Sequence, residues 1–117
     1  MKYIILLILL APSTVFSFNT GSDLQEICRE GKEEGSELAC HAYINGVIEG
    51  VVLGARVVSS DTTGEYVDYK IFCPPDDVTI DQYVAVVKKY MEDHPEVLGE
   101  PSAPLISLAI KEVFPCD

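Results

Sequence analysis

The chain has 117 residues, with 8 basic against 19 acidic side chains and a formal net charge of −11. This length excludes a large multidomain enzyme. The charge disfavours nucleic acids and anionic membrane surfaces as partners, because both are negatively charged. The mean hydropathy is nevertheless positive, at +0.20, so the apolar residues gather in separate segments.

The first of these segments, residues 3–11, follows a single lysine and precedes small and polar residues. This pattern is typical of a secretory signal peptide, and Val15 and Ser17 suit its cleavage site. We therefore predict a signal peptide over residues 1–17 and one exported domain over residues 18–117. That domain has 100 residues and, without the lysine of the signal peptide, a net charge of −12. An uncleaved anchor is the weaker alternative, because the apolar run is too short to span a bilayer.

Four cysteines lie in the predicted mature domain, at Cys28, Cys40, Cys73 and Cys116. An even number in a small exported domain predicts two disulfides, for which three connectivities exist. The spacing favours Cys28–Cys40, which flanks a glycine-containing turn, and Cys73–Cys116, whose members neighbour prolines at predicted helix boundaries. A metal site is disfavoured, because there is no C-x-x-C pair and the two histidines stand far apart in the sequence.

A first short helix is predicted from a capping box, in which Ser22 caps the helix and Gln25 returns the hydrogen bond. Leu24, Ile27 and Cys28 then fall on one face at i, i+3 and i+4. This spacing predicts about two helical turns.

A long central helix is predicted over residues 36–60, beginning at Ser36. Its apolar stripe comprises Ile44, Val47, Ile48, Val51, Ala55 and Val58. A separate row at i+4 spacing comprises Gly46, Gly50 and Gly54. Because glycine destabilises a helix interior, we expect a second neighbouring helix to pack closely on this row. A membrane-spanning dimerisation helix is the rival interpretation, and it is opposed by the charges of Glu49 and Arg56.

Two further helices complete the predicted fold. Thr79 and Gln82 form a second capping box, which predicts the start of a third helix. His94-Pro95 marks the end of that helix. Pro101 or Pro104 suits the first turn of a last helix that bears Leu105, Ile106, Leu108, Ala109 and Val113. Residues 61–72 are predicted as a loop or a short strand. The fold class is therefore all-α, a small disulfide-stapled bundle of four to five helices.

No catalytic constellation emerges from the residues. His41 and His94 lie near helix ends, where structural roles predominate. Asp76, Asp77 and Asp81 lie where the third helix begins, a position that the helix dipole favours for negative charge. Neither a calcium-loop spacing nor a phosphate-binding glycine loop is present. We therefore predict a binding protein with no enzymatic activity, no metal and no cofactor, whose acidic surface steers it toward a protein partner.

Several motifs occur in a characteristic order along the chain. They are Cys40-x-x-Tyr43-Ile44-x-Gly46-x-x-x-Gly50, Phe72-Cys73-x-Pro75, Thr79-x-x-Gln82, His94-Pro95-Glu96 and Phe114-Pro115-Cys116. Together they make residues 24–116 resemble the Tai-type, or Rap/Tai, periplasmic immunity proteins, which protect bacteria from type VI secretion amidases. The resemblance implies a helical, disulfide-stapled periplasmic homodimer that plugs the cleft of a cognate peptidoglycan amidase.

The chain departs from this pattern in a polar insert over residues 61–70 and in the run Gly99-Glu100-Pro101. Loops carry specificity on rigid scaffolds, so we expect the partner contacts in and near these segments. The candidate contact residues are Glu65, Tyr66, Asp68, Tyr69, Glu96, Glu100 and Ser102.

Two other functions are compatible with the sequence. A small periplasmic acid-stress chaperone is also helical, acidic and disulfide-bonded, and it would gain client binding near pH 2 to 3. A hydrolase would instead need a concave pocket with converging carboxylates, and no pair of acidic residues stands out for that role.

Overall fold

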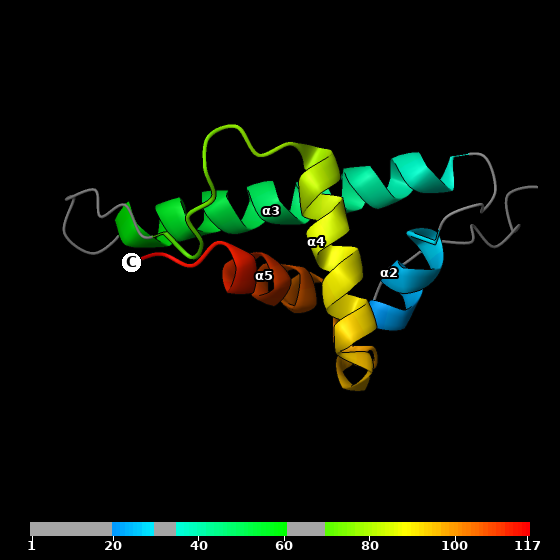
Figure 1. Cartoon of the computed structure of the whole chain (residues 1–117). Helices are drawn as coiled ribbons and strands as arrows, with labels where there is room; N and C mark the ends of the chain where they lie inside the picture. The colour runs from blue at the N-terminus through cyan, green and yellow to red at the C-terminus, as the bar shows by residue number, and fades with distance from the viewer. Residues whose placement is uncertain (1–19, 30–34, 61–69) are drawn as a thin grey trace, which may run out of the picture.

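The computed structural model describes residues 20–29, 35–60 and 70–117, which form an all-α fold (Figure 1). Its α-helices are α2 (Gly21–Ile27), α3 (Ser36–Ser60), α4 (Ile80–Asp93) and α5 (Ser102–Val113), with a 3₁₀ helix over Pro95–Val97. Within these ranges the only β pairing is an isolated antiparallel bridge between Thr20 and Pro101. The predicted fold class is confirmed. The predicted signal peptide and most of the 61–70 insert lie outside the described residues.

The central helix spans the predicted residues 36–60, and the other three α-helices pack against it. In Figure 1, α4 crosses α3, while α2 and α5 lie toward opposite ends of it. The buried hydrophobic core is made of Leu24, Cys28, Cys40, Ile44, Ile48, Phe72, Val84, Val87, Met91, Leu105, Ile106, Ala109 and Ile110. On α5 the buried face includes Ile110 and leaves Leu108 and Val113 exposed.

The helix starts show which capping signals are used. Thr79 caps α4, and its reciprocal hydrogen bonds with Gln82 form the predicted capping box. In α2 the predicted box is wrong, because the cap is Thr20 and its partner is Asp23. The hydroxyl of Ser22 instead donates to the backbone carbonyl of Leu98, at 3.1 Å.

The disulfides join Cys28 to Cys40 and Cys73 to Cys116, the pairing that the spacing predicts. The first ties the end of α2 to the first turns of α3. The second ties the segment that precedes α4 to the end of the chain, where the Cys73 N–H also donates to the Phe114 carbonyl at 2.8 Å. These cross-links fix both ends of the helical assembly.

Candidate functional site

One face of α3 points away from the helices that pack on it. It consists of Gly46, Gly50, Leu53, Gly54 and Val57, and we call it the α3 outer face. Leu53 is 63% exposed and Val57 is 59% exposed, and all three glycines are exposed. Adjacent aliphatic side chains and glycines therefore form an apolar strip on the surface.

The predicted close packing of another helix on the glycine row is wrong for the part of the chain that the structure describes. A Cβ atom built at Gly46, Gly50 or Gly54 would meet no atom of the described residues within 4 Å. The reason is the helical geometry, since Gly46 lies about 200° around the axis from the buried Ile44. The other three described α-helices pack on the Ile44 face, and none of them covers the glycine row.

Two side chains of opposite charge lie along one edge of the α3 outer face. Between residues 42 and 57, Glu49 and Arg56 are the charged side chains. They are seven residues apart, so they lie two turns apart on the same flank. The Glu49 carboxylate accepts a hydrogen bond from Asn45 at 3.0 Å.

The segment Ser36–Val57 is also long and apolar enough to cross a membrane, by length and composition alone. A core helix meets the same criterion. In this protein Cys40, Ile44 and Ile48 are buried against other helices, and Cys40 is cross-linked to α2. These contacts account for only part of the hydropathy of α3, because 17% of its apolar window is buried and the rest includes the exposed α3 outer face.

The predicted contact residues have three different outcomes. Glu96 and Glu100 are exposed. Ser102 is a wrong prediction, because it is 1% exposed and its hydroxyl lies 2.6 Å from the Tyr43 hydroxyl. A side chain in that position supports the packing of α5 on α3 and has no surface to offer a partner. The remaining candidates, in the insert, lie outside the described residues: Glu65, Tyr66, Asp68 and Tyr69.

Glu96 and Glu100 stand on a segment that α2 holds in place. The Gly21 N–H donates to the Glu100 carbonyl at 2.9 Å, and the Ser22 N–H donates to the Leu98 carbonyl at 2.8 Å. A Cβ atom at Gly21 would lie 2.7 Å from a Leu105 methyl carbon and 3.1 Å from the Leu98 Cα. Only glycine allows this close approach. The two carboxylates therefore project from a firmly seated segment, with Glu96 in the 3₁₀ helix and Glu100 just after it.

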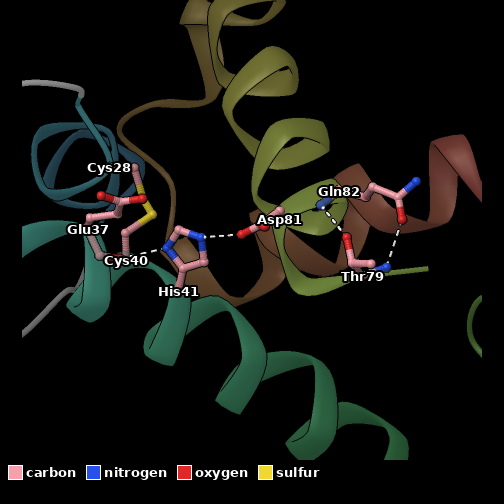
Figure 2. A network of polar contacts seen from close by, with 7 residues as sticks. All are labelled: Cys28, Glu37, Cys40, His41, Thr79, Asp81 and Gln82. Atoms are coloured by element: carbon pink, nitrogen blue, oxygen red, sulfur yellow. Dashed lines mark hydrogen bonds and ion pairs between the residues drawn. A yellow bond between two sulfur atoms is a disulfide. The ribbon is translucent and has the colours of Figure 1, made fainter. Parts of the chain in front are cut away.

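A polar junction that the sequence did not reveal joins α3 to α4. The His41 ring lies between the Glu37 backbone carbonyl, 2.7 Å from Nδ1, and the Asp81 carboxylate, 2.8 Å from Nε2 (Figure 2). The hydrogen bond to the Glu37 carbonyl and then the bond to Asp81 raise the pKa of His41 above its usual value. The two residues are 40 positions apart, and no local signal connects them.

The described residues offer little to metal or thiol chemistry. They contain no group of three His, Cys, Asp or Glu side chains placed to hold a metal ion. All four cysteines are in disulfides. A surface hollow of about 370 Å³ lies between α4 and α5, but its lining includes a single histidine, His94, with Asp93 and Glu112. Among the described residues, the α3 outer face and the segment bearing Glu96 and Glu100 offer exposed surface to another protein.

Comparison with known families agrees with this conclusion. Residues 20–116 match the family described as Rap1a immunity proteins. The match covers most of the chain, so the protein belongs to the Rap1a immunity protein family. Searches of curated proteins and of solved structures returned no match. The family indicates an immunity protein that binds a cognate secreted effector, and the disulfides indicate an oxidising compartment.

Proposed function

We propose that this protein is a periplasmic immunity protein that binds a peptidoglycan amidase delivered by a type VI secretion system and inhibits it by occluding its active-site cleft. The observation that carries the proposal is the family match over residues 20–116. The ordered motifs that resemble Tai-type proteins supply the choice of an amidase as the target. The protein itself has no enzymatic role in this scheme.

Export to the periplasm fits the chain's covalent structure. Residues 1–17 act as a signal peptide in this proposal, and the two disulfides form once the chain reaches an oxidising compartment. The functional test is to mix the protein with the product of the neighbouring gene. We expect a stable complex and loss of peptidoglycan cleavage. A complex without inhibition would contradict occlusion of the cleft.

The amidase contact is proposed to involve the carboxylates of Glu96 and Glu100 and the insert residues Tyr66 and Tyr69. The two glutamates are exposed, Glu96 in the 3₁₀ helix and Glu100 in the segment after it that α2 anchors. Acidic side chains complement a basic enzyme cleft, and tyrosine offers a large contact area with a polar tip.

Truncation of these side chains should weaken the complex without altering the fold. We expect each double variant, Glu96→Ala/Glu100→Ala and Tyr66→Ala/Tyr69→Ala, to lose about 30-fold in affinity, as loss of a hot spot worth 2 kcal/mol would produce. Isothermal titration calorimetry with the amidase measures the effect, and circular dichroism checks the fold.

The control is Asp77→Ala/Glu112→Ala, which removes the same charge from exposed positions elsewhere. It should bind like the parent. If both test variants also bind and inhibit like the parent, the contact lies on a helical face and this assignment fails. Client binding gained only near pH 2 to 3, with no folded partner at neutral pH, would instead favour the acid-stress chaperone.

The protein is further proposed to act as a homodimer in which the α3 outer faces of two copies meet. The glycines leave room for close backbone approach, and Leu53 supplies exposed apolar area at the centre of the strip. Because the remaining surface is strongly acidic, an uncharged strip is the region where two copies repel each other least.

The charged flank favours an antiparallel arrangement. A two-fold axis perpendicular to α3 brings the same flank of both helices together. With the axis near residues 52 and 53, Glu49 of each copy lies at the level of Arg56 of the other. The interface then gains two ion pairs at its edge, each between Glu49 of one copy and Arg56 of the other. These pairs fix the register of the two helices.

A carboxylate placed in this strip should separate the two copies. We expect Leu53→Glu to raise the dimer dissociation constant at least 30-fold in sedimentation equilibrium, because the charge would be buried unpaired. Leu108→Glu is the matched control, since Leu108 is comparably exposed on α5. Glu49→Arg and Arg56→Glu should each weaken the dimer, and the double exchange should restore it. A parent that stays monomeric at high concentration contradicts the interface.

A further inference from the structure

The His41 ring has a hydrogen-bond acceptor at each of its nitrogens. Nδ1 lies 2.7 Å from the Glu37 backbone carbonyl oxygen, and Nε2 lies 2.8 Å from a carboxylate oxygen of Asp81 (Figure 2). Neither a carbonyl nor an ionised carboxylate can donate. A neutral imidazole carries one N–H and can donate to only one of these two acceptors. The imidazolium carries two N–H groups and can donate to both acceptors. The geometry therefore matches the protonated ring.

This ring sits where three helices meet. His41 follows Cys40, whose disulfide leads to Cys28 at the end of α2. Asp81 lies in the first turn of α4, beside the capping box of Thr79. The His41 side chain thus links α3 to α4 next to the covalent link between α3 and α2, as Figure 2 shows.

The charged groups that act on His41 favour its protonated form. Among the described residues these are the carboxylates of Asp81 on α4 and Glu37 on α3, both acidic. They add to the two hydrogen bonds in raising the pKa of His41, and its partial burial opposes them. The ring side chain is 24% exposed and Asp81 is 82% exposed, so water around the carboxylate screens the pair.

We propose that His41 is an acid-strengthened clamp, which holds the start of α4 against the start of α3 more firmly as the surroundings change from mildly alkaline to mildly acidic. The proposal rests on this geometry and does not depend on the identity of the effector. Under this proposal, the stability of the junction of α2, α3 and α4 depends on pH through the His41 side chain.

The direction of the response follows from proton linkage. The pKa of His41 is raised in the folded protein above its ordinary value of about 6.5. The folded state therefore binds the proton more tightly than the unfolded chain. The stabilisation is complete below about pH 6.5 and is lost as the pH rises through the raised pKa of the folded state.

The test is a comparison of variants, because acidification also reduces the overall negative charge of the parent. Urea unfolding of the disulfide-bonded protein between pH 5.5 and 8.5 gives the stability of the parent, His41→Gln and His94→Gln. We expect the equilibrium constant for unfolding to be several-fold larger in His41→Gln than in the parent at pH 5.5, with the difference shrinking toward pH 8.5. His94→Gln should keep the parent's response, since His94 contacts the Tyr90 carbonyl and ring within its own helix end.

An NMR titration of the ring protons provides the second readout and does not require the variants to be stable. The chain has two histidines, so one variant assigns both signals. The midpoint of His41 should lie above that of the urea-unfolded chain, and Asp81→Asn should lower it. A folded-state midpoint at or below the unfolded value, or an equal stability difference at both pH values, would overturn the clamp.

Discussion

Ile44→Ala should lower the free energy of unfolding by about 3 to 4 kcal/mol, because it removes a large aliphatic side chain from a filled core and leaves a cavity. Ile44 is fully buried, at 0% exposure, on the face of α3 that meets the other helices. Urea or thermal unfolding followed by circular dichroism measures the loss.

Leu38→Ala is the control for this substitution, because it truncates an aliphatic side chain of α3 that is 74% exposed. Its effect should stay within about 0.5 kcal/mol, as for other surface positions. Equal losses in the two variants would contradict the orientation of α3, since the buried and exposed faces would then be energetically alike.

Periodicity and capping chemistry were sufficient to predict the helices. The bounds of α3 agree with the predicted range, and the Thr79–Gln82 box places the start of α4. These signals are local, since they depend on residues within one or two turns. The α2 cap shows the limit of such signals, because Ser22 is recruited by the Leu98 carbonyl, 76 positions away.

The glycine row shows a different limit. A helical wheel separates the faces of α3 correctly, but it does not tell which face the other helices cover. In the described residues, α2, α4 and α5 all pack on the Ile44 face. No other described α-helix is left to cover the row of Gly46, Gly50 and Gly54. A glycine row is equally compatible with close packing inside one chain and with an exposed surface. Only the tertiary arrangement separates these two cases.

The functional residues were the least predictable from the sequence. Ser102 follows a proline in a polar segment, which predicts a surface residue. In the structure it is buried, and its hydroxyl lies within hydrogen-bond distance of the Tyr43 hydroxyl. His41 and Asp81 each read as ordinary helix-end residues, and their contact arises only where α3 and α4 come together. The exposure of Glu96 and Glu100 was easier to predict, because glutamates beside prolines are seldom buried in a core.

Removing the Cys73–Cys116 disulfide should cost more stability than removing Cys28–Cys40. The first closes a separation of 43 residues and the second a separation of 12. Loop-closure entropy gives stabilisations of about 4 and about 3 kcal/mol, respectively. The longer cross-link also secures noncovalent contacts, because Phe114 packs edge-on against Tyr83 with ring centroids 6.0 Å apart.

The measurement is chemical denaturation of Cys73→Ala/Cys116→Ala and of Cys28→Ala/Cys40→Ala. We expect both variants to remain helical, with the larger loss of stability in the first. In that variant the backbone amide of residue 73, whose acceptor in the parent is the Phe114 carbonyl, should exchange its hydrogen faster. The four-alanine variant should lose about 7 kcal/mol, which is a large part of the 5 to 15 kcal/mol typical of a folded domain, and we expect it to be largely unfolded at 37 °C. An unfolding midpoint that is unchanged in the four-alanine variant would show that helix packing alone maintains the fold, and the role assigned to both cross-links would then be wrong.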